Sequence, residues 1–510
     1  MNDRPNVLLI LADELRADVL GCYGSPVPAT PALDGLAAQG ARFADCVITQ
    51  PTCTPSRASI LTGAYPSALR SRMVGCFTPD DPRFLGHQFG ANDYRTLSIG
   101  KIHLAPQAAE PELVRMALGG EPDGRAPEGS SYFGFQQVDL VNGHGDHCFG
   151  AGYERYAQTK GVDLYAAQRL FKLTKIPMTT PYPFRLPVEL HSSTYIADRA
   201  VEFLRNEGSE RPFFAHVSFN DPHHPFTVPE PWASKYTHAA LPEPIPHAAT
   251  EMPAWYDTIY RREYPSLDPP VGRVTGTPPV DYAATDADTW RAIRATYHGM
   301  TACLDHHLGR ILAALDETGL AERTIIMFVA DHGDYMGDHG FLGKGLPFDG
   351  ALRVPLIVRG PGVTAGTVIK DPASTLDIAP TLLELAGLAE PEGVQGLSAA
   401  SALAAGAYPR TAALTENDDD MYPIRTRTLT TREWRLTRWA TSGEGLLFDR
   451  IEDPRELHNR YHDPGLTAVR RHLEQQLFDE VLCSIDYING RRQKPATISK
   501  RWVPAHNGGI

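Results

Sequence analysis

Cys53 and Arg57 are two residues whose types and spacing indicate chemistry. They belong to the string CTPSR, which precedes a short apolar run ending at Gly63. Thr54 suits a helix N-cap, Pro55 suits the first helical position, and Gly63 suits the helix stop. The unpaired N–H groups of such a helix and the Arg57 guanidinium would bind an oxyanion beside the Cys53 sulfur. On these residues alone, a buried packing cysteine and a surface arginine remain the alternative.

Two acidic residues, Asp13 and Glu14, follow the apolar run of residues 6–12. That run predicts a strand buried on both faces. Open α/β sheets bind their ligands at the carboxyl ends of strands, so both acids are candidate metal ligands. Taken alone, an N-cap for a helix over 15–20 explains them equally well.

The same arrangement recurs where the apolar run 324–330 ends in Asp331 and His332. Neighbouring residues on a strand point to opposite faces, so these two could bind one ion only if the chain turns there. Gly333 permits that turn. The chain therefore places carboxylates, an imidazole and the cysteine with its arginine at the ends of three predicted strands.

Basic side chains stand at three other places. Lys101 and His103 lie two apart in a run, 94–104, that predicts another strand, so their side chains point to the same side. His223 follows a later predicted strand, and Lys344 stands in a glycine-flanked loop. The Lys101–His103 pair and Lys344 would, by themselves, be ordinary solvent-exposed residues.

Together these motifs resemble a known family. The string CTPSRASILTG resembles the signature of the type I sulfatases of the alkaline phosphatase superfamily, in which this cysteine is converted to formylglycine. Gly-Lys-Ile-His at 100–103 is similar to the second signature of that family, and Pro-His-His-Pro at 222–225 to an element that follows a core strand. The resemblance extends from about residue 6 to about residue 459, with the motifs in family order.

The resemblance implies a sulfuric ester hydrolase of the arylsulfatase kind, with a role for each candidate. The implied metal ligands are Asp13, Glu14, Cys53 as formylglycine, Asp331 and His332. The implied catalytic residues are Cys53, Arg57, Lys101, His103, His223 and Lys344. Hydrated formylglycine would attack the sulfur to form a covalent sulfo-enzyme intermediate while Arg57, Lys101 and Lys344 stabilise the transferring charge. His223 or Lys344 would protonate the leaving oxygen, and His103 would be the base that helps to expel sulfate.

Two positions depart from the commonest sulfatase pattern. Glu14 stands where many members have a second aspartate, and His332 where many have asparagine. An imidazole ligand shifts the expected divalent ion toward manganese, with calcium as the alternative. Phosphonate monoester hydrolases of the same superfamily share the Asp-His pair, so hydrolysis of phosphonate monoesters or phosphodiesters is the alternative function. They lack the Lys-x-His element, and Lys101 with His103 therefore favours sulfate esters.

The expected fold is the α/β class, an alkaline-phosphatase-like mixed sheet sandwiched by helices, with a smaller C-terminal α+β subdomain. We expect a catalytic domain over 1–392 with irregular insertions at about 105–190 and 228–280, and a second unit over 393–488. The tail 489–510 could contact a partner subunit. A histidine-rich patch at 143–148 lacks the ligands of a closed zinc site, so a surface loop is expected there.

Composition bounds the partners and the compartment. A formal charge of -13 without a basic stripe argues against nucleic acid. The seven cysteines are scattered without paired spacing, and no signal peptide is recognised, which favours a reducing compartment and a cytoplasmic protein. No apolar run approaches the ~20 residues needed to cross a membrane. The expected partners are a small sulfate ester, a formylglycine-generating maturation enzyme and further copies of the chain in a dimer or tetramer.

Overall fold

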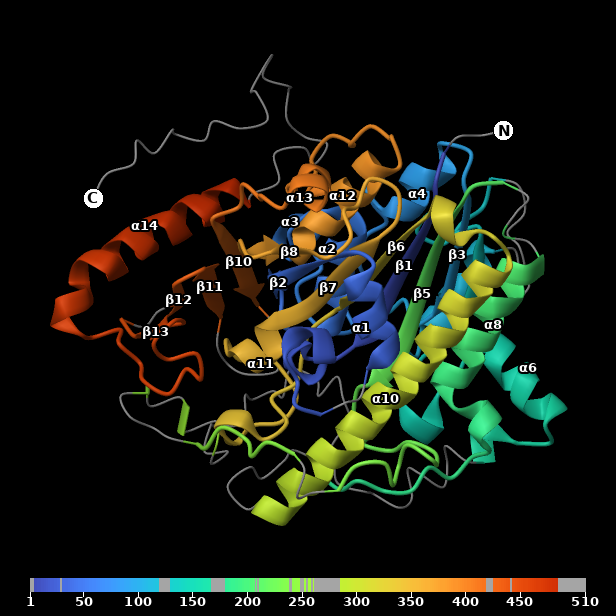
Figure 1. The fold of residues 1–510 in the computed structure, drawn as a ribbon, viewed down its shortest axis with the longest axis horizontal. Coiled ribbons are helices and arrows are strands. Elements are labelled where there is room, and N and C mark those ends of the chain that lie inside the picture. Colours follow the sequence, from blue (N-terminus) through green and yellow to red (C-terminus); the bar gives the residue numbers. More distant parts are fainter. Residues whose placement is uncertain are drawn as a thin grey trace.

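The structure is a computed structural model (Figure 1). It describes residues 4–27, 30–118, 129–166, 179–206, 208, 211–237, 241–247, 252–253, 256–257, 260, 285–418, 425–440 and 443–484. Part of the predicted insertion 228–280 and the whole predicted tail 489–510 lie outside these residues.

One large mixed sheet holds most of the apolar runs. Among the described residues it has nine strands, in the order β4-β3-β5-β1-β6-β7-β2-β8, with β9 paired to β2. Their bounds are β1 Asn6–Asp13, β2 Ala41–Val47, β3 Arg95–Gly100, β4 Gln137–Leu140, β5 Phe213–Pro222, β6 Thr324–Ala330, β7 Arg353–Arg359, β8 Thr367–Ile369 and β9 Ala373–Ser374. β7 is antiparallel to both of its neighbours, and the other pairings are parallel. Every strand but β7 therefore runs in the same direction.

β1 forms the centre of this sheet because its side chains are apolar on both faces. All of its residues are buried. Leu8 pairs with Ala215 of β5 on one side and with Ile326 of β6 on the other. A strand covered on both faces needs this continuous apolar sequence, as predicted from residues 6–12.

Helices flank the sheet (Figure 1). α10 packs against α1 and α8 along one face of the sheet (Figure 1). α2 packs against α4 and α12 in a second group of helices. The helices are α1 Pro31–Ala38, α2 Cys53–Thr62, α3 Pro66–Leu69, α4 Leu85–Gly90, α5 Glu110–Ala117, α6 Ala151–Thr159, α8 Ser192–Asn206, α10 Ala287–Glu317, α11 Asp349–Leu352, α12 Ile378–Leu385, α13 Ala400–Ala405 and α14 Thr467–Cys483. No helix in the described part of the chain is long and apolar enough to span a membrane.

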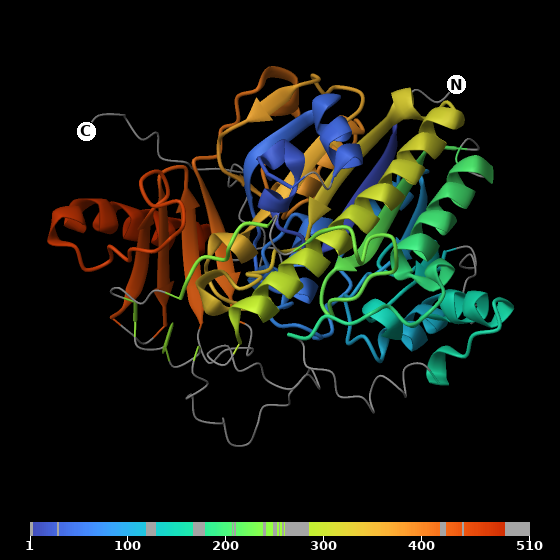
Figure 2. The same cartoon turned by 60° about the horizontal axis from the view of Figure 1, so that its bottom comes forward.

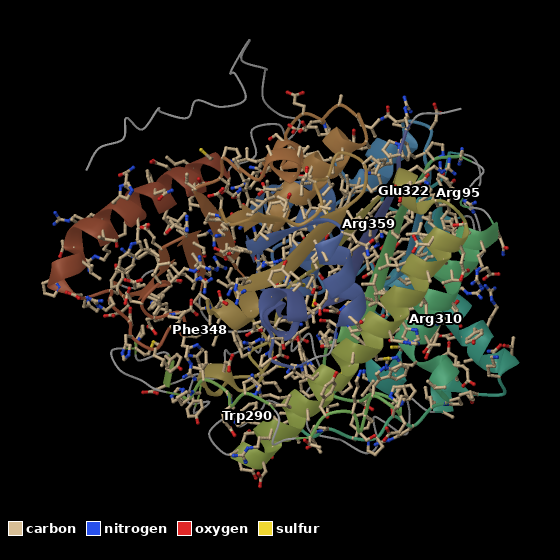
Figure 3. All side chains as sticks on the ribbon, in the orientation of Figure 1. Arg95, Trp290, Arg310, Glu322, Phe348 and Arg359 are labelled. Atoms are coloured by element: carbon tan, nitrogen blue, oxygen red, sulfur yellow. The ribbon has the colours of Figure 1, made fainter. Side chains whose placement is uncertain are left out.

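A second, antiparallel sheet lies beside the main body (Figure 2). It contains β10 Ala412–Asn417, β11 Thr426–Thr431, β12 Trp434–Trp439 and β13 Gly445–Asp449, and α14 packs on it. Phe348, labelled in Figure 3, lies at the junction, where its ring centroid is 6.2 Å from that of Phe448. The predicted architecture of a helix-flanked mixed sheet with a smaller C-terminal subdomain is confirmed, whereas the boundary at residue 393 stays a prediction.

Candidate active site

The strand directions bring the candidate residues to one edge of the large sheet. Because β1, β3, β5 and β6 are parallel, their carboxyl ends meet at that edge. Asp13 ends β1, Lys101 follows β3, His223 follows β5 and Asp331 follows β6. β2 runs in the same direction and leads into α2, which begins at Cys53.

Cys53 occupies the first residue of α2, where backbone N–H groups lack helical partners. The N-cap is Thr52, so the predicted cap at Thr54 is wrong by two positions. Thr54 is already the second residue of the helix, and its hydroxyl accepts a hydrogen bond of 3.1 Å from the N–H of Gly75. Gly63 ends α2 in the left-handed conformation, as predicted. The cysteine therefore lies within the first helical turn rather than before it.

Four of the predicted metal ligands converge. One ligand atom from each of Asp13, Cys53, Asp331 and His332 lies within 4.8 Å of the others, and all four residues are buried. We call these four residues the metal group. The His332 Nδ1–H group donates to the carbonyl oxygen of Gly333 at 2.9 Å, which leaves Nε2 facing Cys53 Sγ at 3.1 Å. Two carboxylates and an imidazole nitrogen that has its lone pair free fit a divalent cation.

The charges around this group also favour a cation. Burial opposes ionisation of Asp13, but Lys101 and Arg57 hold the pKa of its carboxyl well below the usual range. Burial would lower the pKa of His332, yet the Asp331 carboxylate raises it to about 9. The cluster therefore attracts positive charge, which a bound metal ion would supply in place of the imidazolium proton.

Arg57 lies next to the metal group and binds the carboxylate of Asp331. Its side chain is 1% exposed. Its Nε–H donates to Asp331 Oδ2 at 2.7 Å, and one terminal nitrogen donates to Lys101 O and Ser218 Oγ, both at 2.9 Å. The guanidinium thus orients a metal-group carboxylate in addition to supplying charge.

Lys101 and His103 lie beyond β3, so the predicted strand over 94–104 is too long. Gly100 has φ 99°, and this left-handed turn ends the strand. Lys101 Nζ contacts Asp13 Oδ2 and lies 3.4 Å from His144 Nε2. Burial lowers the pKa of His103 well below its usual value, and Lys101 and Arg57 lower it further. His103 is therefore a neutral imidazole at this edge.

Glu14 belongs to a second group, together with His223, His224 and Lys344. Its Oε2 lies 3.1 Å from His223 Nε2 and 3.2 Å from His224 Nδ1, and its Oε1 lies 3.4 Å from Lys344 Nζ. Although burial opposes ionisation, Lys344 and His224 lower the pKa of Glu14 to about 2. Lys344 Nζ joins the two groups because it also lies 3.3 Å from Cys53 Sγ. Glu14 is outside the four-residue metal group.

His144 is a site residue that the sequence analysis missed. It was expected in a surface loop, but it is buried, and its ring stacks on His223 with centroids 3.7 Å apart. It groups with Asp13 and His223. Its sequence surroundings indicate a loop and carry no periodic signal, so only the folded chain shows this contact.

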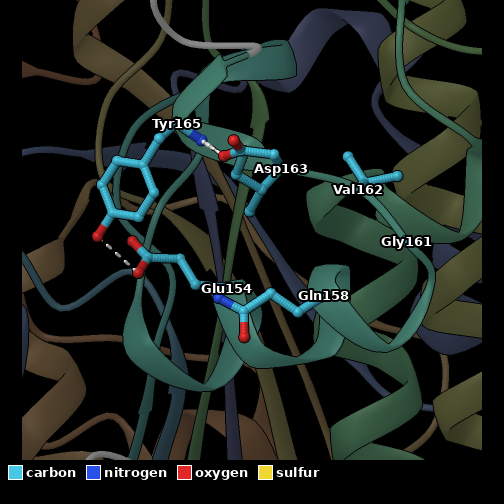
Figure 4. Close-up of a pocket in the computed structure, with 7 residues that line it drawn as sticks. Glu154, Gln158, Gly161, Val162, Asp163 and Tyr165 are labelled. Carbon is cyan, nitrogen blue, oxygen red and sulfur yellow. Dashed lines mark hydrogen bonds between the residues drawn. The ribbon is translucent and has the colours of Figure 1, made fainter.

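A separate small cavity lies beside α6 (Figure 4). It has a volume of about 260 Å³ and contains none of the candidate residues. Tyr165 closes one side by donating its hydroxyl to Glu154 Oε2 at 3.0 Å. The chemistry-bearing residues therefore gather at the sheet edge and not in this cavity.

Comparison with known proteins agrees with the geometry. Residues 5–388 match the sulfatase family, and residues 337–481 match the family described as N-sulphoglucosamine sulphohydrolase, C-terminal. The chain is 28% identical to an arylsulfatase of Clostridium perfringens, over 89% of this chain and 90% of that protein. It is 29% identical to a multifunctional alkaline phosphatase superfamily protein of Trinickia caryophylli, over 93% and 94% of the two chains.

A solved structure is similar over nearly the whole length. The phosphonate monoester hydrolase of Agrobacterium radiobacter superposes with a TM-score of 0.76 at 28% identity, covering 95% of this chain and 96% of that one. Because the family match spans most of the chain and includes the whole catalytic edge, this protein belongs to the sulfatase family of the alkaline phosphatase superfamily, a family of sulfuric ester hydrolases.

Proposed function

We propose that this protein hydrolyses sulfate monoesters, in the manner of an arylsulfatase, with a formylglycine made from Cys53 as its nucleophile. The observation that carries the proposal is the buried group of Asp13, Cys53, Asp331 and His332 at the start of α2. These residues would hold one divalent ion, with manganese favoured by the imidazole and calcium as the alternative. When bound, the ion supplies Lewis-acid stabilisation of negative charge on the transferring group.

The chain's own cations would stabilise the same charge. Lys344 Nζ lies 3.3 Å from the Cys53 side chain, and Lys101 Nζ contacts Asp13 on the other side. Burial would lower the pKa of Lys344, but Cys53 in the unconverted chain raises it, and so do the Glu14 and Asp13 carboxylates, which remain after conversion and favour a charged ammonium. Two fixed ammonium groups in a site shielded from water suit an anionic sulfuryl group.

Proton transfers complete the proposed cycle. One hydroxyl of the formylglycine hydrate releases its proton to solvent and attacks sulfur. The ester S–O bond breaks, and the leaving oxygen takes a proton from Lys344 or His223, which regains one from solvent. These two share a hydrogen bond of 2.9 Å. The second hydroxyl then gives its proton to the neutral His103, the bond between carbon and the sulfate oxygen breaks, and the aldehyde and free sulfate form. Water adds to the aldehyde to restore the hydrate, and His103 returns its proton to solvent.

Hydrolysis of phosphonate monoesters or phosphodiesters at the same site is the second candidate. The His332 imidazole in the metal group favours it, as does the likeness to a phosphonate monoester hydrolase. A single preparation assayed with an aryl sulfate and with a phenyl phosphonate monoester ranks the two activities by kcat/KM.

Intact-protein mass spectrometry tests the nucleophile. Conversion of Cys53 to formylglycine lowers the mass by about 18 Da. We expect converted protein to hydrolyse the aryl sulfate and Cys53→Ala to lose this activity. An active preparation with an unmodified Cys53 thiol would refute the mechanism.

We also propose a cytoplasmic homo-oligomer, a dimer or tetramer, that depends on a formylglycine-generating enzyme for maturation. The seven cysteines, none of them in a disulfide, support a reducing compartment. Light scattering on purified protein tests the assembly state, and expression without a maturation enzyme tests the dependence of activity on conversion.

A further inference from the structure

Glu14 directly follows a metal-group aspartate, yet its backbone turns its side chain elsewhere. Its φ is 66°, a left-handed conformation that is strained for a non-glycine residue. Two contacts hold this turn. The Glu14 N–H donates to Asp331 Oδ1 at 3.0 Å, and the Tyr297 hydroxyl of α10 donates to the Glu14 carbonyl at 2.6 Å. The Asp13 carboxylate therefore lies in the metal group, whereas the Glu14 carboxylate lies beside His223, His224 and Lys344.

The Glu14 carboxylate is fully buried and faces three nitrogen-bearing side chains. His223 and His224 follow β5, while Lys344 comes from the loop after β6. All three nitrogens lie between 3.1 and 3.4 Å from a Glu14 oxygen. Among the described residues, Glu14 thus supplies the carboxylate that contacts both proposed proton donors, Lys344 and His223.

A second metal ion is the competing explanation, since Glu14, His223 and His224 could supply three ligands. The position of Lys344 argues against it. The Lys344 ammonium is 2.9 Å from His223 Nε2 and 3.4 Å from Glu14 Oε1, so a positive charge already occupies the space between two of the three ligands. A divalent ion there would have to displace it.

We propose that Glu14 is a positioning residue for leaving-group departure and not a ligand of the metal ion. Its carboxylate holds Lys344 and His223 together at the place where the ester oxygen departs. The inference rests on the proposed function, because it assigns Glu14 a part in the proton transfer of that reaction. It predicts that Glu14 matters most for esters whose leaving groups need a proton.

The test compares Glu14→Gln with the wild type as full-length, formylglycine-containing protein. Gln keeps the size of Glu14 but removes the charge that holds Lys344. We expect the same metal content per chain by elemental analysis. We expect kcat/KM to change little for 4-nitrophenyl sulfate, whose leaving group departs without protonation, and to fall about 10²-fold for unsubstituted phenyl sulfate.

Asp13→Asn is the matched comparison because its carboxylate lies in the metal group, and it should lose metal. Tyr297→Phe provides an independent variant that keeps Glu14 but releases its carbonyl, and it should show a weaker form of the same leaving-group dependence. Loss of metal from Glu14→Gln, or an equal loss of rate for both esters, would overturn the inference. A wild type that hydrolyses neither ester would instead refute the proposed function.

Discussion

At the scale of single residues, Arg57 joins three parts of the site through one guanidinium. Its planar set of donors reaches Asp331, Lys101 O and Ser218 at once. Lysine keeps the charge but cannot make these bonds in the same directions.

We therefore predict that Arg57→Lys weakens metal binding about 10- to 100-fold, the usual cost of losing a group that orients a ligand. Titration calorimetry with Mn²⁺ measures the change. Arg115→Lys, at an exposed arginine on α5, is the control and should bind as the wild type does. Equal affinities in the two variants would show that Arg57 does not orient Asp331.

At this scale, the positions of residues that directly follow a predicted strand could be predicted from the sequence. The pair Asp331-His332 follows its strand directly, so the end of the apolar run was enough to place both. The direction of the Glu14 side chain could not be predicted from the sequence, because the Tyr297 hydroxyl that binds the Glu14 carbonyl lies 283 positions away in the chain. His144 was missed for the same reason, since its partners Asp13, Lys101 and His223 lie at or just beyond the ends of three strands that are distant in the sequence.

At the scale of secondary-structure elements, the end of β3 depends on a close approach of two backbones. A Cβ atom on Gly100 would lie 1.9 Å from the carbonyl oxygen of Ser218, and φ there is 99°. Apolar runs predicted the strands well, but the pattern around Gly100 did not reveal this contact, so the strand was extended too far.

Gly100→Ala should destabilise the protein by about 3 kcal/mol or more, through steric overlap and backbone strain together. Gly35→Ala in α1 is the matched control, because nothing lies within 4 Å of its Cβ position, and it should be neutral or stabilising by up to about 1 kcal/mol. Chemical denaturation compares both with the wild type. Similar stabilities for the two variants would contradict the role given to Gly100.

Asp349 of α11 ties the large sheet to the C-terminal one. It pairs with Arg353 at 2.8 Å and with Arg435 of β12 at 2.9 Å. Burial alone would raise its pKa, but Arg353, Arg435 and Arg450 hold the pKa well below the usual range. A carboxyl whose pKa is lowered by folding stabilises the protein above its unfolded pKa of about 4 and loses that effect as the pH falls further.

Asp349→Asn should therefore cost about 1–3 kcal/mol at pH 7, because it removes the carboxylate that pairs with Arg353 and one of the two that pair with Arg435, which keeps Glu456. The difference from the wild type should shrink below pH 4, where the Asp349 carboxyl of the unfolded wild-type chain takes up a proton that the folded protein does not bind. Unfolding measured at several pH values checks this. For Asp288→Asn, at an 87% exposed aspartate, we expect little effect at any pH. A deficit in Asp349→Asn that did not vary with pH would argue against the ion pairs.

At the scale of the whole molecule, the residues of the metal group come from parts of the chain that are far apart in the sequence, from Asp13 to His332. An ion that binds only when these segments are folded together stabilises the entire domain. We predict that removing metal with a chelator lowers the unfolding temperature and that Mn²⁺ restores it. The gain should be about 2.7 kcal/mol at a free concentration 100-fold above Kd.

His332→Ala should abolish this metal-dependent shift, measured for each protein against its own metal-free form, because loss of the buried imidazole also lowers the stability of the metal-free variant. Calorimetric melting with and without Mn²⁺ makes the comparison. A full metal-dependent shift in His332→Ala would place the ion elsewhere.

The central place of β1 has a consequence for how the chain is made. β1 leaves the ribosome well before its partners β5 and β6, whose residues follow some 210 and 320 positions later. At about 5–20 residues per second, β6 emerges tens of seconds after β1. Both edges of this apolar strand stay unpaired until β5 emerges, and one stays unpaired until β6 does. The nascent chain, more than the finished enzyme, is therefore the form most exposed to aggregation and most in need of a chaperone.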